Sequence, residues 1–299
     1  MSGDFPSADR LPVAVGLLVV GHGTADPVGE AETRRLVERV AEALPGRSVE
    51  LGFLEVIGPT VAEGLRRLRD RGCREVIAAP LLLFTAGHAR RDLPEALAEA
   101  AAALGLPVRQ AGALGSHPEL VRLSRRRREQ ACHALSTLPA AEEALVFVGR
   151  GASDPAAVAQ LTGFLAATRA CAADPSHCRP GLPAAVCGRG LLPAVCHAVP
   201  PPAGPGREMV GFVAAVRPSV AETLEAVVDA TLPGPVPRRV LVQPHLLFRG
   251  RVEEQVHEAV DQARARHPDV DFVVVPRLGP EPEVARALVA RAIEAATTR

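Results

Sequence analysis

Residues 13–27 read VAVGLLVVGHGTADP, and this stretch decides the fold. The apolar run from Val13 to Val20 stops at a Gly-His-Gly turn, and a helical pattern follows from about Asp26. An apolar run of this length, closed by glycines and followed by a helix, is typical of a buried parallel strand that leads into a βα turn. Ligands bind at the carboxyl edge of such sheets, so we expect His22 to face a cleft.

The first half of the chain continues this alternation of strands and helices. Short loops between the elements indicate an α/β fold, a parallel sheet with helices on both faces. Prolines at or near three of the expected helix starts suit positions where a missing N–H costs nothing. We predict strands at 13–20, 48–55, 75–82 and 107–112, and helices at about 27–44, 59–71, 92–104 and 117–135.

The second half of the chain repeats the first. Residues 17–27 (LLVVGHGTADP) align with 145–155 (LVFVGRGASDP), and residues 80–84 (PLLLF) align with 244–248 (PHLLF). Two copies of one βα arrangement therefore follow each other in the chain.

The offset between the copies grows from 128 to 159 residues and then to 164, which indicates an insertion of 31 residues at about 171–207. We predict two lobes, an N-terminal lobe at 1–138 and a degenerate C-terminal lobe at 139–299 that contains the insertion.

Potential ligands for a metal ion or a proton follow all four expected strands of the first copy. The second copy keeps the scaffold but not these groups, which favours chemistry carried by the first lobe alone over ordinary loop histidines. Two imidazoles and a carboxylate suit divalent Fe, Co, Ni or Zn, and a neutral imidazole also accepts a proton near pH 7. The four candidates are His22, Glu55, His88 and His117, and their counterparts are Arg150, Ala214, Val252 and Glu281.

Three motifs in this order resemble one family of enzymes. They are GHGT at 21–24, GFLE at 52–55 with Pro59 after it, and PLLLFTAGH at 80–88 followed by RDLP at 91–94. Together they are similar to the class II chelatases, the sirohydrochlorin cobaltochelatases and ferrochelatases. The resemblance covers 13–125 closely and 143–297 as a degenerate copy, and it implies two flavodoxin-like lobes with a cleft between them.

The resemblance implies that the protein inserts Co²⁺ or Fe²⁺ into sirohydrochlorin without ATP, in cobalamin or sirohaem biosynthesis. His22 would then bind the metal and help to remove the pyrrole protons, and Glu55 and His88 would complete the metal site. Such ligands must also release the ion, so a closed four-cysteine cage would not suit this task.

The substrate is a flat macrocycle that carries many carboxylates. Leu83 and Phe84, within the apolar segment 81–84, are candidates to lie against the ring, as is the segment 246–248 in the second lobe; buried strand core is the alternative. Arg90 and Arg91 are candidates to bind its carboxylates, because arginine grips them in a bidentate manner. A solvated helix start is the alternative for these two arginines. Arg150 is a further candidate to reach a substrate carboxylate.

The insertion contains four cysteines within 26 residues, Cys171, Cys178, Cys187 and Cys196. Clustered cysteines indicate a zinc ion or an iron–sulfur cluster, yet no Cys-x-x-Cys pair is present. A surface loop rich in Pro, Gly and Ala is the alternative.

Several other residues receive structural interpretations. We expect His117 to cap a helix, His245 to be packed, and the arginine run 125–128 to face solvent. Asp26 and Asp154, each before a proline, also indicate helix caps.

The composition narrows the chemistry. The chain has 34 basic and 34 acidic residues, so it has no global attraction to nucleic acid or to an anionic membrane. It contains no Lys, Tyr or Trp, which excludes a Schiff-base lysine and a tyrosyl acid. No targeting segment is visible, and we expect a cytoplasmic monomer or homodimer.

Two other functions are alternatives for a chain with this Gly-His-Gly turn. Phosphoryl transfer by a histidine nucleophile requires an Arg before the His, where this chain has Gly21. A non-catalytic carrier of a tetrapyrrole or a metal on a chelatase scaffold stays open as the alternative.

Overall fold

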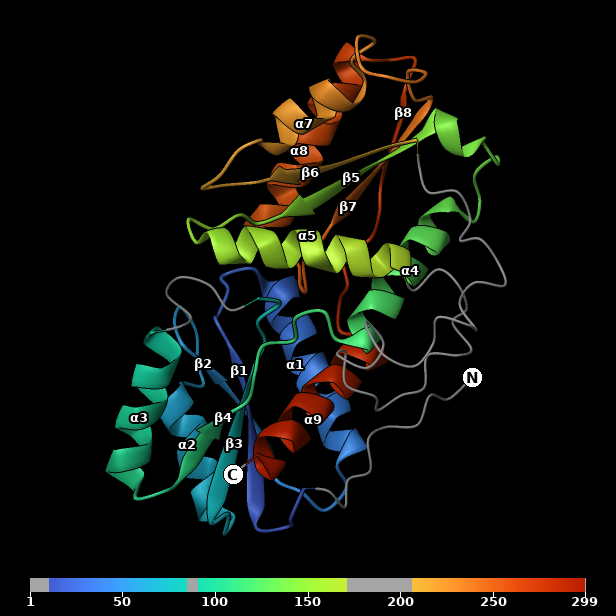
Figure 1. The fold of residues 1–299 in the computed structure, drawn as a ribbon. Helices are drawn as coiled ribbons and strands as arrows, with labels where there is room; N and C mark the ends of the chain where they lie inside the picture. Colours follow the sequence, from blue (N-terminus) through green and yellow to red (C-terminus); the bar gives the residue numbers. More distant parts are fainter. Residues whose placement is uncertain (1–10, 85–90, 171–205, 299) are drawn as a thin grey trace. The chain divides into compact units, whose positions relative to one another are not determined.

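The computed structural model describes residues 11–84, 91–170 and 206–298 (Figure 1). These residues form two compact units. The first unit takes in the described residues up to Leu120 together with those from Gly279 on, and the second takes in those from Val121 to Leu278. Each unit contains one four-stranded sheet.

The sheet of the first unit is entirely parallel, with the strand order β2-β1-β3-β4. Its central strand β1 is buried along its whole length, as the apolar run predicts. The chain goes from β1 to β2 on one side and returns to β3 on the other, so the connections change direction at β1. Its strands are β1 (Val15–Gly21), β2 (Val49–Phe53), β3 (Glu75–Pro80) and β4 (Val108–Gln110).

Helices cover both faces of this sheet (Figure 1). On one face, side chains such as Leu18 and Val20 pack against α2 and α3 in one hydrophobic cluster. On the other face, α9 packs against β3 and α1. The helices are α1 (Pro27–Ala43), α2 (Val61–Asp70), α3 (Asp92–Leu104) and α9 (Pro282–Thr297).

The second unit repeats this sheet with the strand order β6-β5-β7-β8. Its strands are β5 (Glu143–Gly149), β6 (Arg207–Phe212), β7 (Arg239–Pro244) and β8 (Asp271–Val274). The helices α7 (Val220–Val227) and α8 (Arg251–Arg266) share one core cluster with the sheet. The remaining elements are α4 (Pro118–Cys132), the short 3₁₀ helix η3 (Ala140–Glu142) and α5 (Pro155–Ala170). The α/β class with two parallel-sheet units is thus confirmed.

The two units do not follow the halves of the sequence. α9 comes last in the chain but belongs to the first unit, and α4 belongs to the second unit from Val121 onward. Within the second unit, the buried Ser124 of α4 accepts two hydrogen bonds from the Gln243 side chain of β7, at 2.7 and 3.0 Å. The compact units therefore differ from the lobes predicted at 1–138 and 139–299, because the fourth helix of each repeat packs in the unit of the other repeat.

Helix caps fix several of the loops that follow strands. Asp26 accepts hydrogen bonds from the backbone of Val28 and Gly29 at the start of α1, and Asp154 accepts one from Ala156 at the start of α5. Both predicted caps are confirmed. Capping boxes begin α2 and α7 as well, formed by Thr60 with Glu63 and by Ser219 with Glu222.

The prediction that the arginine run 125–128 faces solvent is wrong. All four residues are only partly exposed, because α4 packs inside the second unit. Arg127 donates a 2.8 Å hydrogen bond to the Leu278 carbonyl, and Arg128 donates one to Thr168 of α5. Burial lowers the pKa of Arg128.

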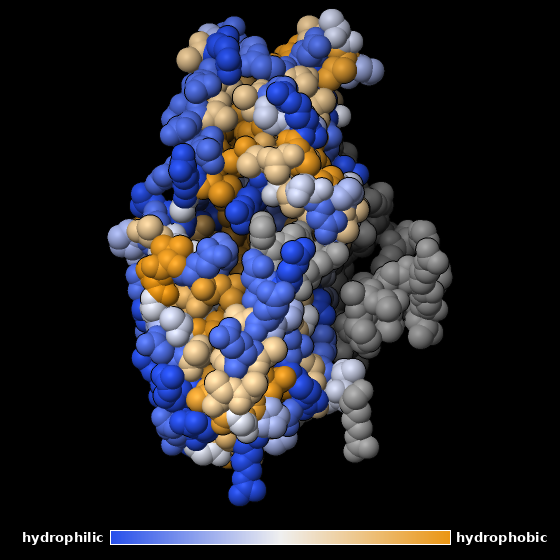
Figure 2. Space-filling view, turned by 90° about the vertical axis from the view of Figure 1, so that its left-hand side faces the viewer, coloured by the Kyte–Doolittle hydropathy of each residue, from blue (hydrophilic) through white to orange (hydrophobic). Residues whose placement is uncertain are grey.

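Hydrophilic residues cover much of the face shown in Figure 2, with hydrophobic residues in patches between them. In the ranges that the structure describes, none of the helices has the length and apolar character needed to cross a membrane.

Candidate active site

The ends of β1 and β2 bring His22 and Glu55 next to each other. The parallel pairing of the two strands continues beyond Gly21 and Phe53, since Leu54 N–H donates to the Gly21 carbonyl and Glu55 N–H donates to the His22 carbonyl, both at 3.0 Å. Both side chains are exposed. Neither makes a hydrogen bond or an ion pair with the part of the chain that the structure describes, so both are available to a ligand.

The glycine after His22 makes this arrangement fit. Gly23 has a φ of 104°, a value that side-chain-bearing residues rarely adopt. A Cβ atom at this position would collide with the carbonyl oxygen of Glu55. The turn after His22 therefore needs a glycine at position 23, because the backbone after β2 passes directly over the backbone after β1.

The next residues after β2 form a tight turn. Ile57 N–H donates a 2.8 Å bond to the Glu55 carbonyl, and Val56 between them has a φ of 70°. This turn holds the Glu55 backbone from its other side. Glu55 is thus fixed between β1 and the start of α2, while its carboxylate remains at the surface.

The segment after β3 starts beside the end of β1. Leu81 N–H donates to the Val20 carbonyl at 2.8 Å, and the Leu82 and Leu83 carbonyls accept hydrogen bonds from the loop after β4. Leu81 is buried, whereas Leu83 and Phe84 are partly exposed. The segment lies beyond the strand, which ends at Pro80, so part of its apolar surface is accessible at the carboxyl edge.

Some predicted site residues cannot be placed. His88 and Arg90 lie outside the described residues, as do Cys171, Cys178, Cys187 and Cys196. Arg91 is exposed and immediately precedes α3. Among the described residues, no three His, Cys, Asp or Glu side chains gather closely enough to hold a metal ion. Two of the three predicted ligands, His22 and Glu55, are brought together by the backbone.

His117 and His245 take the structural roles predicted for them. The Nδ1 atom of His117 accepts a 3.3 Å hydrogen bond from Glu119 N–H at the start of α4. His245 is only 3% exposed, and its ring centroid lies 4.1 Å from that of Phe164 and 5.5 Å from that of Phe147. Burial lowers the pKa of His245 to about 3, so this imidazole is neutral at physiological pH.

The second unit keeps the backbone of the site without its ligands. Ala214 N–H donates to the Arg150 carbonyl at 2.9 Å, and Val216 N–H donates to the Ala214 carbonyl at 2.8 Å. Gly151 has a φ of 88°, and a Cβ there would collide with the Ala214 carbonyl oxygen. The two turns therefore have the same backbone conformation, with Arg150 at the position of His22 and Ala214 at the position of Glu55.

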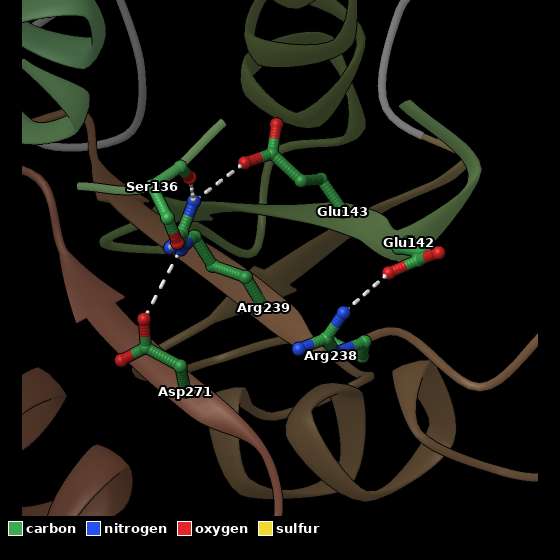
Figure 3. A network of polar contacts seen from close by, with 6 residues as sticks. All are labelled: Ser136, Glu142, Glu143, Arg238, Arg239 and Asp271. Carbon is green, nitrogen blue, oxygen red and sulfur yellow. Dashed lines mark hydrogen bonds and ion pairs between the residues drawn. The ribbon is translucent and has the colours of Figure 1, made fainter. Parts of the chain in front are cut away.

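A different polar cluster lies at the amino edge of the second sheet (Figure 3). It borders a cavity of about 520 Å³. The Arg239 side chain, which is 6% exposed, donates to Glu143 at 3.0 Å, to Asp271 at 3.1 Å and to the Ser136 carbonyl at 2.9 Å. Arg238 pairs with Glu142 at 3.1 Å. Because carboxylates and a carbonyl already bind the buried guanidinium, this cluster ties the strand starts together and is not a second active site.

Comparison with known proteins decides the family. A family model described as CbiX matches residues 16–131 and 203–295. The chain belongs to the CbiX family. The match reaches into both repeats and leaves out residues 132–202, which contain β5, α5 and the four clustered cysteines.

Relatives of this CbiX protein are sirohydrochlorin chelatases by name. The sirohydrochlorin cobaltochelatase of Priestia megaterium is 24% identical over 286 residues, which cover 93% of this chain and 79% of the relative. The sirohydrochlorin ferrochelatase of Bacillus subtilis is 28% identical over 149 residues, which cover 50% of this chain and 55% of the relative.

The fold of this CbiX protein is also found in a solved structure, SirB from Bacillus subtilis with Fe³⁺. The two share 22% identity with a TM-score of 0.71, and the match covers 95% of this chain and 96% of SirB. The predicted resemblance to the class II chelatases is confirmed at the level of family and fold.

Three arginines near the second copy of the turn were not predicted as site residues. Arg217, Arg249 and Arg251 are exposed at the carboxyl edge of the second sheet. The alignment of the two repeats contains the signal for them, since the matching residues of the first repeat are the uncharged Gly58, Thr85 and Gly87.

Proposed function

We propose that this protein inserts Co²⁺ or Fe²⁺ into sirohydrochlorin without ATP, in the biosynthesis of cobalamin or sirohaem. The observation that carries the proposal is the backbone pairing of His22 with Glu55 at the carboxyl edge of the first sheet, where both side chains are exposed and make no hydrogen bond or ion pair with the described residues. Membership of the CbiX family and the names of its relatives point to the same reaction.

The reaction determines what the site must do. A divalent ion enters the macrocycle as two pyrrole N–H protons leave, so the site needs ligands that exchange readily and a base near the ring. One imidazole and one carboxylate bind such an ion more weakly than a closed cage of cysteines. His22 and Glu55 would hold the ion. Once the ion has moved to the ring nitrogens, the freed His22 imidazole would accept one pyrrole proton, and the second proton would pass to solvent water.

His88 completes the proposed set of ligands. It comes four residues after Phe84, in the segment that leaves β3 at the carboxyl edge beside β1. The sequence therefore keeps His88 within a short length of chain from that edge. Leu83 and Phe84 would contact the apolar face of the macrocycle there. Arg90 and Arg91 would then lie where the substrate carboxylates are bound.

The test uses the purified full-length chain, metal-free sirohydrochlorin and Co²⁺ or, without oxygen, Fe²⁺. Insertion changes the visible absorption of the macrocycle, and we expect a rate well above the spontaneous one. His22→Ala and His88→Ala should each lower kcat/KM by about 100-fold or more, because each removes a group that acts on the metal or the proton.

His257→Ala is the matched control, since His257 is an exposed histidine on α8, far along the chain from the proposed ligands. It should leave the rate unchanged. A wild-type rate equal to the spontaneous rate would favour the non-catalytic carrier. Full activity in His22→Ala would contradict the proposed role of this residue.

Two finer expectations also belong to the proposal. The cysteines of the insertion would bind zinc or an iron–sulfur cluster, which metal analysis and visible absorption of the purified protein would detect. The chain would work in the cytoplasm as a monomer or homodimer, and light scattering measures that state.

A further inference from the structure

We propose that the carboxyl edge of the second sheet binds the carboxylates of the substrate through Arg150 and Arg251, with Arg217 and Arg249 beside them. The inference rests on the proposed function for the identity of the ligand, a small molecule that carries many carboxylates. It assigns a binding role to the repeat that has lost the metal ligands.

The topology brings these four residues to one edge. Arg150 follows β5, the central strand, and Arg217 follows β6 on one side of it. Arg249 and Arg251 follow β7 on the other side. Neighbouring strands lie about 4.8 Å apart, so loops that leave adjacent strands at the same edge present their side chains to a common surface.

Hydrogen bonds between the loops fix this arrangement. The Arg150 carbonyl accepts a bond from Ala214 in the loop that carries Arg217, and His245 N–H donates to the Val148 carbonyl near the end of β5. The loops after β5, β6 and β7 are therefore joined by their backbones where they leave the sheet.

The charges at this edge are only partly neutralised. Arg217 forms an ion pair with Glu222, and Arg249 lies 3.9 Å from Glu254. Within the ranges that the structure describes, the guanidinium groups of Arg150 and Arg251 form neither an ion pair nor a hydrogen bond. The edge thus retains positive charge that an anion can bind.

Fold stability does not account for these two arginines. Arg251 is the first residue of α8, where a positive charge opposes the helix dipole. Arg150 occupies a turn whose backbone is the same in the first unit with a histidine, so the turn does not require arginine. Like charges on adjoining loops repel each other, and a ligand that carries several carboxylates relieves that repulsion.

The experiment compares two double variants of the full-length chain. Arg150→Gln/Arg251→Gln removes the two charges that have no partner among the described residues. Arg238→Gln/Arg266→Gln removes the same charge from the same unit, but at the start of β7 and the end of α8, away from the carboxyl edge. Both control residues are exposed, with side chains 69% and 50% accessible.

Binding is measured without turnover, by absorption titration of metal-free sirohydrochlorin. We expect the Arg150→Gln/Arg251→Gln variant to bind at least about tenfold more weakly, and the control to stay within about twofold of wild type. The difference should shrink at high salt and vanish for sirohydrochlorin whose carboxylates are methyl-esterified, because screening or removing the charges removes the contact.

Each outcome decides something. Equal affinity of wild type and Arg150→Gln/Arg251→Gln for sirohydrochlorin overturns the inference. An equal loss of affinity in the control variant also overturns it, as does a difference between wild type and Arg150→Gln/Arg251→Gln that persists for the methyl ester. If Arg150→Gln/Arg251→Gln binds sirohydrochlorin more weakly as expected, but the wild type does not accelerate metal insertion, the inference is supported and the proposed catalysis fails. Wild-type protein that inserts metal while both double variants bind equally well leaves the proposed function and overturns the inference.

Discussion

The backbone N–H of Glu55 donates a 3.0 Å hydrogen bond to the carbonyl oxygen of His22. The same bond joins Ala214 to Arg150 in the second unit, at 2.9 Å. The turn geometry is therefore independent of the side chains that it carries. The proposed chemistry depends on the side chains of one copy, and the backbone that presents them can be tested separately.

Gly23→Ala should destabilise the first unit by about 3 kcal/mol or more. The new Cβ would collide with the Glu55 carbonyl oxygen, and the φ of 104° is unfavourable for alanine. Urea unfolding measures the loss. The matched control is Gly46→Ala, whose φ is 74° but whose Cβ would meet no atom within 4 Å, so it should cost only about 1 kcal/mol. Equal losses in the two variants would show that the close approach to Glu55 is unimportant.

Glu55→Gln should raise the KM for Co²⁺ about tenfold, because an amide is a weaker ligand for a divalent cation than a carboxylate. High metal concentration should recover part of the rate. Initial rates at varied Co²⁺ concentrations check this expectation. Glu258→Gln removes an exposed carboxylate from α8 and should change nothing. An unchanged KM in Glu55→Gln would remove Glu55 from the metal site.

His245→Leu should make stability less dependent on pH. Burial lowers the pKa of His245 to about 3, well below the usual 6.5 that it regains on unfolding. The unfolded chain therefore binds one more proton between these values, and stability falls as pH falls through that window, by about 1.4 kcal/mol per pH unit. Leucine is the natural substitute, since the matching residue of the first repeat is the buried Leu81.

The measurement is the free energy of unfolding at pH 6, 5 and 4 for wild type and His245→Leu. Carboxylates titrate in both proteins, so only the difference between the two slopes reports on His245. Parallel curves would show that His245 is protonated in the folded protein at these pH values.

Leu288→Ala should destabilise the first unit by about 2–5 kcal/mol, although Leu288 belongs to the second repeat. Leu288 is 1% exposed on α9, which packs against β3 and α1. Hydrogen exchange should show faster exchange in β1 and β3 and little change in β5 and β7. Leu224→Ala, at a fully buried position of α7, should give the opposite pattern. Faster exchange in β5 and β7 of Leu288→Ala would contradict the assignment of α9.

The elements themselves were predictable because local patterns determine them. The helix expected at 92–104 is α3, and the strand expected at 75–82 is β3 with two residues beyond its end. The motifs GHGT and GFLE do not reveal the close approach of Gly23 to Glu55 or the tight turn at Val56, which become visible only in the structure. The sequence indicated the residues of the turn but not how its backbones cross.

The placement of α4 and α9 was not predictable in this way. An amphipathic helix carries the same apolar stripe whichever sheet it covers, so the repeat alone cannot assign it to a unit. The partial burial of the arginine run 125–128 is unpredictable for the same reason, because the partners of Arg127 and Arg128 come from the loop after β8 and from α5 of the second unit. His245 was predicted correctly, since apolar neighbours on both sides already indicated a packed position.

The position of α9 has a consequence for synthesis on the ribosome. A nascent chain that has emerged as far as Leu278 contains every described part of the second unit, yet the β3 face beside α1 still lacks its cover. The unit with His22 and Glu55 must wait through translation of more than half the protein before its last helix arrives. The unit whose strands are made first is therefore completed last.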